Sequence, residues 1–194
     1  SWTLTALPLF VWMGEILFRT KLSENLFEGL SPWMQKLPGG LIHVNVVGCA
    51  LFAAISGSSA ATVATVGKMS IPELRKRNYP EKILLGSLAG SGTLGLLIPP
   101  SIILIIYGVT VQESIAKLFV AGIIPGIMIA LIFMGYVILW SLFNKKEMPN
   151  IINQYSFIDK IKKSGQLIPV IILIVSVIGS IYTGIATATE AASL

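Results

Sequence analysis

Four long stretches of the sequence contain no charged residue, and this pattern limits the chain to a few kinds of fold. No Asp, Glu, Lys or Arg occurs in residues 37–67, 83–112, 118–144 or 164–189. Each stretch runs to roughly 26 to 31 residues, and about 20 are enough for a helix to cross a bilayer. Charged residues make up only 12% of the chain and hydrophobic residues 54%, which is not the composition of a soluble domain. We therefore expect an all-α, polytopic membrane protein.

The basic residues indicate how the chain is oriented in the membrane. The net charge is +5, but Lys and Arg lie in short segments between the apolar stretches. This is the usual distribution of orientation signals in membrane proteins, whose cytoplasmic loops are rich in these residues. We therefore predict no nucleic-acid partner.

The motifs indicate neither enzymatic chemistry nor a metal centre built on thiolates. Cys49 is the only cysteine, so neither a disulfide framework nor a thiolate metal site can form. His43 is the only histidine, and neither a catalytic constellation nor a Walker loop is found. We predict that the protein is not an enzyme. Because the sequence starts without Met and stops soon after a new apolar run begins, we also expect a piece of a longer protein.

Residues 4–18 and 22–37 predict two helices of different character. The first is apolar and ends at Arg19 and Lys21, which suggests a cytoplasmic end. Glu15 lies one turn before Arg19 and is expected to pair with it. The second helix carries apolar side chains at helical spacing on one face and charged side chains on the others. It could lie along the membrane interface or pack as a connector on the protein's own surface, and the sequence favours neither.

Residues 41–67 predict a re-entrant helical hairpin. As a single helix they would extend about 40 Å, beyond a hydrocarbon core of about 30 Å, and would place basic residues on both sides of the membrane. A hairpin with arms 41–55 and 60–67 keeps these basic residues on the cytoplasmic side. Ser56-Gly57-Ser58-Ser59 would form its tip near mid-depth, because Gly57 accepts a positive φ and the serine hydroxyls can satisfy freed backbone groups.

Residues 83–111 predict a second interruption. Pro99 and Pro100 cannot continue a helical hydrogen-bond ladder. Unwound backbone at membrane depth persists only where it is buried in protein or lines a polar cavity. Two half-helices are therefore expected, with a single Pro-kinked helix as the alternative.

The remaining residues predict two further membrane-spanning helices, 118–143 and 166–182, joined by a cytoplasmic loop. That loop, 144–163, carries five lysines. After the last of these helices a new element begins, in which Thr187 and Glu190 resemble a helix N-terminal cap.

Both interruptions offer groups that bind ions and small anions. Carbonyl groups without helical partners at the hairpin tip can coordinate a hard cation such as Na⁺, and the N-terminus of the following half-helix presents N–H groups and a positive dipole to an anion. Gly92 and Thr93 precede the second break, where Thr93 adds a hydroxyl oxygen. Helix packing through small residues would use the same composition and stays open as the alternative. Asn45 could either bind a ligand or form an interhelical hydrogen bond, whereas a structural role is favoured for His43.

Several short motifs occur in the order found in one family of bacterial and archaeal carriers. They include Leu37-Pro38-Gly39-Gly40-Leu41, Ile55-Ser56-Gly57-Ser58-Ser59-Ala60, Thr93-Leu94-Gly95, Ile98-Pro99-Pro100-Ser101 and Ala121-Gly122-Ile123-Ile124-Pro125-Gly126. With these motifs, essentially the whole chain resembles the large membrane subunit (M, DctM-like) of the TRAP transporters, the tripartite ATP-independent periplasmic carriers. The resemblance assigns the chain to the N-terminal half of that subunit.

The resemblance implies an elevator-type ion-transporter fold made of two inverted repeats, of which this chain would contain the first. Residues 1–40 would be the end of a scaffold helix and an interfacial amphipathic helix. Residues 41–112 would be part of the transport domain, with the re-entrant hairpin and the broken helix. Residues 113–183 would be the membrane-spanning helices with their cytoplasmic loop, and 184–194 would begin the next element.

The resemblance also implies the residues of the site. The Na⁺ ligands would come from Asn45, Ser56, Gly57, Ser58, Gly92 and Thr93. The substrate would contact Ser58, Ser59 and Thr62. Pro99 and Pro100 would form the helix break, and Na⁺ would act as the coupling ion with no other cofactor.

The implied function is sodium-coupled secondary uptake of an organic acid, such as a C4-dicarboxylate, sialic acid or a related sugar acid. The partners would be an extracytoplasmic solute-binding protein, a small membrane subunit (Q, DctQ-like) and the lipid bilayer, in the cytoplasmic membrane of a bacterium or archaeon. The alternatives are a stand-alone Na⁺-coupled anion carrier of the same broad fold, and a scaffold or channel subunit that does not transport.

Overall fold

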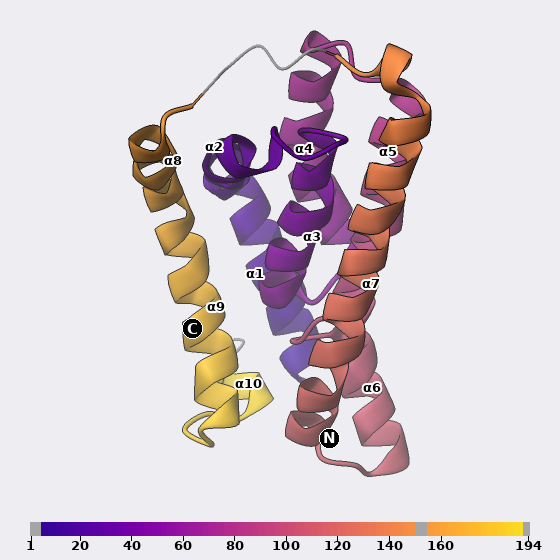
Figure 1. Cartoon of the computed structure of the whole chain (residues 1–194). Coiled ribbons are helices and arrows are strands. Elements are labelled where there is room, and N and C mark those ends of the chain that lie inside the picture. Colours follow the sequence, from indigo (N-terminus) through magenta and orange to yellow (C-terminus); the bar gives the residue numbers. More distant parts are fainter. Residues whose placement is uncertain (1–4, 150–154, 192–194) are drawn as a thin grey trace.

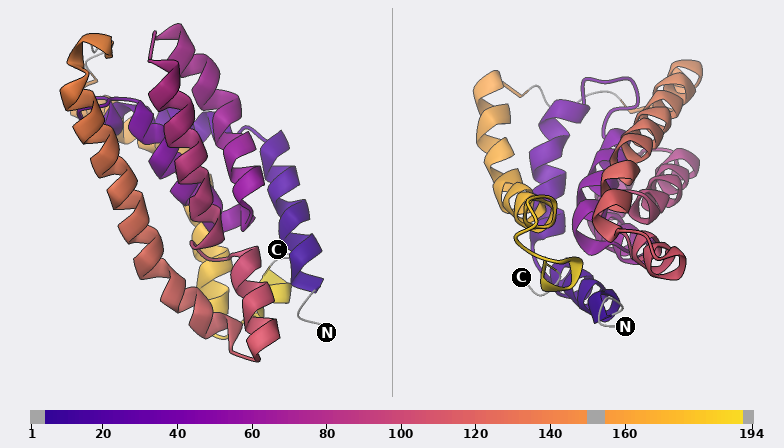
Figure 2. Two further views of the ribbon diagram at one scale, coloured as in Figure 1. Left: turned by 90° about the vertical axis from the view of Figure 1, so that its right-hand side faces the viewer. Right: turned by 90° about the horizontal axis from the view of Figure 1, so that it is seen from below.

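The structure is a computed structural model that describes residues 5–149 and 155–191, and within these ranges every regular element is helical. The α-helices are α1 (Ala6–Arg19), α2 (Leu22–Met34), α3 (Ile42–Ser56), α4 (Ser59–Lys76), α5 (Glu81–Gly92), α6 (Ile102–Val111), α7 (Ile115–Phe143), α8 (Phe157–Ser164), α9 (Ile168–Tyr182) and α10 (Ala188–Ala191). Among the described residues, short 3₁₀ turns also lie at Thr93–Leu96, Lys145–Glu147 and Gly165–Leu167. Figures 1 and 2 show that the longer helices run roughly along one direction. The prediction of an all-α protein is confirmed for the described residues.

Within the part of the chain that the structure describes, two helices are long and apolar enough to cross a membrane. α7 contains 29 residues, and α8 with α9 spans Phe157–Tyr182, which contains 26. Only 17% of the most apolar part of each helix is buried within the structure, so neither is the covered core helix of a soluble protein. Large apolar side chains such as Leu131, Ile132 and Val175 are exposed instead. Helices that are apolar on every side and uncovered by protein are typical of a membrane protein.

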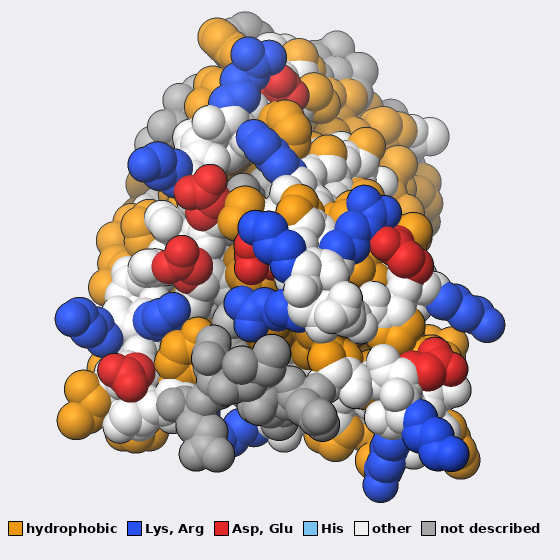
Figure 3. All heavy atoms as spheres, turned by 90° about the horizontal axis from the view of Figure 1, so that it is seen from above, with side chains coloured by type: hydrophobic (Ala, Val, Ile, Leu, Met, Phe, Trp, Pro, Cys, Tyr) orange, Lys and Arg blue, Asp and Glu red, His pale blue; other side chains and the backbone are white. Residues whose placement is uncertain are grey.

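Charged side chains gather at one end of the molecule, which we call the charged end. The C-terminal ends of α4 and α7, the beginning of α5, and α8 all lie there (Figure 1). Figure 3 shows Lys and Arg side chains spread over this end, with Asp and Glu side chains between them. Arg75 and Glu81 pair there, with Nε 2.6 Å from Oε1. The opposite end is the one at which α6 leads into α7.

α3 and α4 form an antiparallel hairpin at the centre of the molecule. α3 is buried along nearly its whole length and packs against α2, α4, α5, α7 and α9. Both ends of the hairpin lie at the charged end, where the Leu41 N–H donates to the Tyr79 hydroxyl at 3.0 Å. The second arm was predicted too short. It continues beyond Gly67 to the end of α4, because Ser70 and Leu74 are buried against neighbouring helices and carry the helix into the charged end.

The apolar face of α2 packs on the protein itself. Leu22, Leu26 and Leu30 are buried in one hydrophobic cluster with Ile42 of α3 and Val170 of α9. Of the two alternatives that the sequence left open, the structure therefore favours a connector packed on the protein's own surface.

Residues 144–163, predicted as a loop, contain all of the helix α8 except its last residue, Ser164. Its N-terminus has a reciprocal cap, in which the Ser156 N–H donates to the Asp159 carboxylate at 3.1 Å. Its other end is held by α2, where the Trp33 Nε1–H donates to Ser164 Oγ at 2.8 Å. The helix was not predicted because a lysine-rich segment is as typical of a loop as of an exposed helix. Residues 150–154 of the segment lie outside the described residues.

Two local predictions are confirmed. Arg19 Nε donates to the Glu15 carboxylate at 3.0 Å, one helical turn away. At the start of α10, the Thr187 N–H donates to the Glu190 carboxylate at 2.8 Å, and the Glu190 N–H donates to Thr187 Oγ1 at 3.3 Å. Glu190 is thus part of a helix cap, as its spacing from Thr187 predicted.

Candidate functional site at two paired helix ends

The tip of the hairpin is a two-residue turn between Ser56, the last residue of α3, and Ser59, the first residue of α4. Gly57 adopts a left-handed conformation with φ of 62°, which glycine adopts without steric cost. Ser58 is extended, and its Oγ accepts from the Ala61 N–H at 3.4 Å. A serine in this position is a favoured N-cap, because its oxygen satisfies one of the free N–H groups of the first turn. The sequence therefore ends one helix and starts another within the tip.

The second interruption has the same local design. α5 ends at Gly92, a 3₁₀ turn follows, and residues 97–101 are unwound before α6 begins at Ile102. Ser101 is extended like Ser58, and its Oγ accepts from the Leu104 N–H at 3.4 Å. The Ser101 hydroxyl also donates to the Leu96 carbonyl at 2.6 Å, across the unwound segment. Pro99 and Pro100 lie in this segment, so the predicted helix break is confirmed, and two half-helices replace the kinked single helix.

The tip and the break are in direct contact. The Ile102 N–H, at the start of α6, donates to the Gly57 carbonyl at 3.1 Å. Gly95 lies so close to the tip that a Cβ atom added to it would be 2.9 Å from Ser59 N and 3.0 Å from Ser58 C. On the other side of the tip, Gly14 of α1 lies against Ser56. The structure thus brings four helix ends together in the interior: the ends of α3 and of the 3₁₀ turn, and the beginnings of α4 and α6.

Where these helix ends meet, backbone C=O and N–H groups that have no hydrogen-bond partner within their own helix lie close together. The last carbonyl groups of α3, such as those of Ile55 and Ser56, have no partner within their helix, and the first N–H groups of α4 and α6 have none within theirs. Helix C-termini attract cations and helix N-termini attract anions. Among the described residues no group of three or more His, Cys, Asp or Glu side chains gathers to hold a metal ion. A cation at this place would therefore be held by carbonyl and hydroxyl oxygens, which suit a hard ion such as Na⁺.

The four hydroxyl groups of the tip face different surroundings. Ser56 and Thr62 are fully buried, and Thr62 Oγ1 donates to the Ser58 carbonyl at 2.7 Å and lies 3.0 Å from Ser56 Oγ. These two side chains hold the turn from inside. Ser58 and Ser59 are only half-buried. Of the residues predicted to contact substrate, the structure therefore leaves Ser58 and Ser59 reachable, whereas the Thr62 hydroxyl is occupied within the tip.

The residues predicted before the break also separate into two groups. Gly92 lies beside the tip, since an added Cβ would be 3.8 Å from the Ser59 carbonyl oxygen and would overlap Val63. Thr93 is exposed, and its Oγ1 donates to the Gly90 carbonyl in the last turn of α5 at 2.6 Å. Both positions border the paired helix ends.

Asn45 does not lie with the other predicted Na⁺ ligands. It precedes Ser56 by eleven residues of α3, so at a rise of about 1.5 Å per residue it is about 16 Å from the tip along the helix axis. Its Nδ2 donates to the Leu84 carbonyl at 3.1 Å and to Ser87 Oγ at 3.0 Å. The structure thus favours the interhelical hydrogen bond that the sequence left open for Asn45. His43 is also structural, with Nε2 2.8 Å from the Pro38 carbonyl oxygen.

Two residues of the paired helix ends were missed as site residues. Gly95 and Ser101 appeared in the sequence only as parts of motifs. Ser101 had a usable signal, because a serine that follows two prolines and precedes an apolar run is a typical N-cap. Gly95 had no such signal in the sequence, because its role depends on the close approach of the hairpin tip, which is distant in the chain.

These observations define a class of protein: an all-helical membrane protein whose interior contains paired helix ends built from backbone groups. The family model of the DctM component of the tripartite ATP-independent periplasmic transporter matches residues 1–194. The chain belongs to this family of TRAP transporter large permeases.

Three similar proteins show the range of the family. The chain is 35% identical over its whole length to the C4-dicarboxylate TRAP transporter large permease protein DctM of Pseudomonas aeruginosa, covering 44% of that protein. It is 36% identical to the isethionate TRAP transporter permease protein DctMQ of Oleidesulfovibrio alaskensis, covering 30% of it. It is 34% identical to the sialic acid TRAP transporter large permease protein SiaM of Vibrio cholerae, covering 45% of it. The chain thus spans less than half the length of these relatives.

Proposed function

We propose that this chain forms the first half of a permease that takes up an organic acid together with Na⁺. One observation carries the proposal: the hairpin tip and the helix break are joined by the hydrogen bond between Ile102 N–H and Gly57 C=O, with Gly95 against the Ser58–Ser59 backbone. The tip and the break interrupt two apolar segments, and where they contact each other they form a polar site at membrane depth. Two unrelated kinks would not need to lie in contact.

The substrate class follows from the helix N-termini and from the relatives. α4 and α6 both begin at the paired helix ends, so the N–H groups of their first turns and the positive ends of two dipoles face this region. The solutes in the names of the three relatives described above, C4-dicarboxylate, isethionate and sialic acid, are organic anions. A carboxylate or sulfonate would bind at Ser58 and Ser59, whose side chains are the reachable ones of the tip.

Na⁺ would bind next to the anion and prepare its site. The C-terminal carbonyls of α3 and the carbonyls freed between residues 93 and 101 are its ligands, with Ser56, Gly57 and Ser58 on one side and Gly92 and Thr93 on the other. Binding of Na⁺ would fix the tip against the break before the anion arrives. No covalent reaction is proposed: the protein binds Na⁺ and the anion and controls their access to the site.

The rest of the mechanism rests on membership of the family. The hairpin would be re-entrant and would move with α5 and α6 as an elevator, relative to a scaffold that includes α1, α7 and α9, and a second inverted repeat would complete the site. An extracytoplasmic solute-binding protein would deliver the anion, and a small Q subunit, separate or fused, would attach to the scaffold. The protein would be multi-pass in the cytoplasmic membrane, with the charged end in the cytoplasm, as its Lys and Arg content favours.

The test is uptake by the intact permease in proteoliposomes with its binding protein. Ser58→Ala and Thr93→Ala are expected to lower Na⁺-dependent uptake without preventing membrane insertion. Ser114→Ala is the matched control, because Ser114 is exposed at the opposite end and its side chain caps no helix. Unchanged uptake and unchanged Na⁺ dependence in both site variants would refute the site. Full uptake without the binding protein would instead identify a stand-alone carrier.

A further inference from the structure

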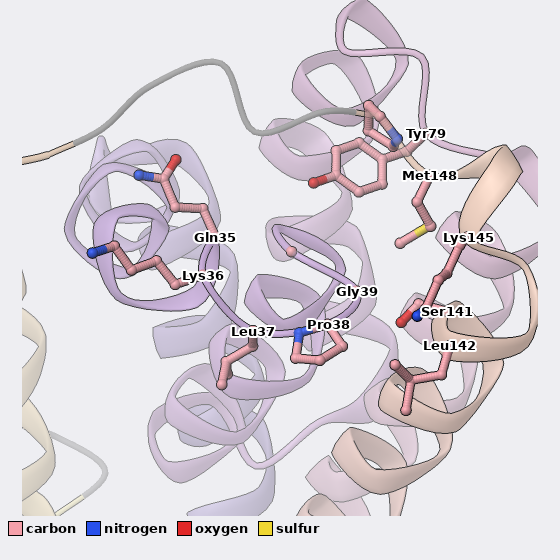
Figure 4. Close-up of a pocket in the computed structure, with 12 residues that line it drawn as sticks. Gln35, Lys36, Leu37, Pro38, Gly39, Tyr79, Ser141, Leu142, Lys145 and Met148 are labelled. Carbon is pink, nitrogen blue, oxygen red and sulfur yellow. The ribbon is translucent and has the colours of Figure 1, made fainter.

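A cavity of about 550 Å³ lies at the charged end, away from the paired helix ends. It is open to the surface and is lined by the connection between α2 and α3, the connection between α4 and α5, and the end of α7 with the residues that follow it (Figure 4). Its walls include Leu37, Gly39, Tyr79, Ser141, Lys145 and Met148. The cavity therefore touches three parts of the chain that are far apart in the sequence.

The charged side chains among the described residues of the cavity's walls are all basic. Lys36 and Lys145 line the cavity, and no Asp or Glu is among the described residues of its walls. The ion pairs found in residues 5–149 and 155–191 involve neither lysine. In Figure 4 Lys145 extends into the cavity toward Ser141, whereas Lys36 lies at the rim and extends away from Tyr79. One ammonium group thus points inward, and a second belongs to a lining residue whose side chain extends away from Tyr79.

Tyr79, which lines the cavity from the connection between α4 and α5, adds a neutral donor. Its oxygen accepts from the Leu41 N–H, so the hydroxyl hydrogen is left to donate to a ligand. Burial raises the pKa of Tyr79 above its ordinary value, and the hydroxyl therefore stays protonated at neutral pH. Ser141 is different, because its hydroxyl donates to the carbonyls of Val137 and Ile138 in its own helix.

The cavity is continuous with the apolar surface of α7. Leu142 lines the cavity and is 45% exposed, and Leu139 and Phe143 beside it are 58% and 86% exposed. The end of an apolar, outward-facing helix next to lysines is where the headgroup region of a bilayer is expected. A ligand of this cavity would thus have an anionic group at the lysines and an apolar part along α7.

We propose that the cavity binds the phosphate group of an anionic phospholipid from the leaflet at the charged end. Lys145 and Tyr79 donate to the phosphate oxygens, Lys36 adds a second positive charge from the rim, and the acyl chains lie along Leu139 and Leu142. The bound lipid bridges the hairpin and α7 and stabilises their packing. This proposal does not depend on the identity of the transported solute.

The experiment uses the full-length permease, purified in detergent and stripped of lipid. Phosphatidylglycerol is added, and its binding is followed by native mass spectrometry and by the shift in Tm. Phosphatidylcholine tests the need for net negative charge, and inorganic phosphate tests whether a free anion suffices. Phosphatidylglycerol is expected to bind and raise Tm, whereas the other two are not.

Lys145→Gln is the deciding variant, and Lys146→Gln is its matched control. The two lysines are adjacent and equally charged, but only Lys145 lines the cavity. Loss of one charge-assisted hydrogen bond is expected to weaken phosphatidylglycerol binding about tenfold in Lys145→Gln, with wild-type affinity in Lys146→Gln. Lys145→Arg keeps a cationic donor and is expected to retain most of the binding, which separates loss of contact from misfolding.

Three results would overturn the proposal. Equal affinity in Lys145→Gln and wild type would show that Lys145 is not a ligand. Equal weakening in both Gln variants would indicate a diffuse charge effect in place of a cavity. Inorganic phosphate that raises Tm as much as phosphatidylglycerol does at equal concentration would remove the lipid as the ligand.

Discussion

Replacing Gly95 with Ala tests the contact between the hairpin tip and the helix break. The Cβ atom of Ala would lie 2.9 Å from Ser59 N and 3.0 Å from both Ser58 C and Ser59 Cα. All three atoms belong to the backbone, so no flexible side chain can move aside. The tip would have to withdraw from the break, which would lengthen or break the hydrogen bond between Ile102 N–H and Gly57 C=O.

The stability lost through this close contact can be compared with the stability gained when Ala replaces Gly in a helical turn. Overpacking of this kind destabilises by about 1–3 kcal/mol, whereas Ala in place of Gly in a helical turn gains at most about 1 kcal/mol. With the full gain subtracted, the net effect is a loss of up to about 2 kcal/mol. If about 1 kcal/mol of it appears in Na⁺ binding, the Na⁺ concentration for half-maximal uptake rises roughly fivefold.

The assay combines thermal unfolding of the purified full-length permease with uptake at a series of Na⁺ concentrations. Gly86→Ala is the matched control, because Gly86 lies within α5 and has no atom within 4 Å of an added Cβ. It should leave the Na⁺ dependence unchanged and raise Tm slightly. If Gly95→Ala matched Gly86→Ala in both measurements, the contact of tip and break would not matter for the site.

Three further substitutions test individual contacts in the intact permease. Ser101→Ala removes the cap of α6 and the bond to the Leu96 carbonyl; the free energy of unfolding should fall by about 0.5–2 kcal/mol, and no change in denaturant unfolding would argue against the cap. Tyr79→Phe leaves the Leu41 N–H without its partner, at a cost of about 1–3 kcal/mol, which faster hydrogen exchange at the start of α3 would reveal. Asn45→Ala should lower Tm and leave the Na⁺ dependence of uptake unchanged, since Asn45 joins α3 to α5. A shifted Na⁺ dependence would indicate that Asn45 is a Na⁺ ligand after all.

The interruptions of the helices could be predicted because their causes are local. A glycine that takes a left-handed conformation, a serine that caps the next helix, and two prolines that lack N–H groups act through their immediate neighbours. Gly57, Ser58, Pro99 and Pro100 therefore mark the tip and the break in the sequence itself. The Glu15–Arg19 pair belongs to the same category, because helical spacing alone brings the two side chains together.

The parts that could not be predicted depend on packing between distant segments. Only the folded chain places Gly95 against Ser59, or directs the amide of Asn45 to the Leu84 carbonyl. The length of α4 was misjudged for a related reason. The arm was predicted to end at Gly67, just before the charged Lys68, whereas the Lys68 ammonium group lies 4.7 Å from the centre of the Phe18 ring and the helix continues past it.

The central claim is that the hairpin tip forms part of a site shared by Na⁺ and a carboxylate. Its most direct test is the rate at which a thiol reagent modifies Ser58→Cys in a Cys49→Ala background of the full-length permease. The account predicts that Na⁺ and the transported anion together slow modification several-fold, that K⁺ with the same anion does not, and that a cysteine at Ser114 is unaffected. A modification rate at position 58 that is the same with Na⁺ and with K⁺ would contradict it.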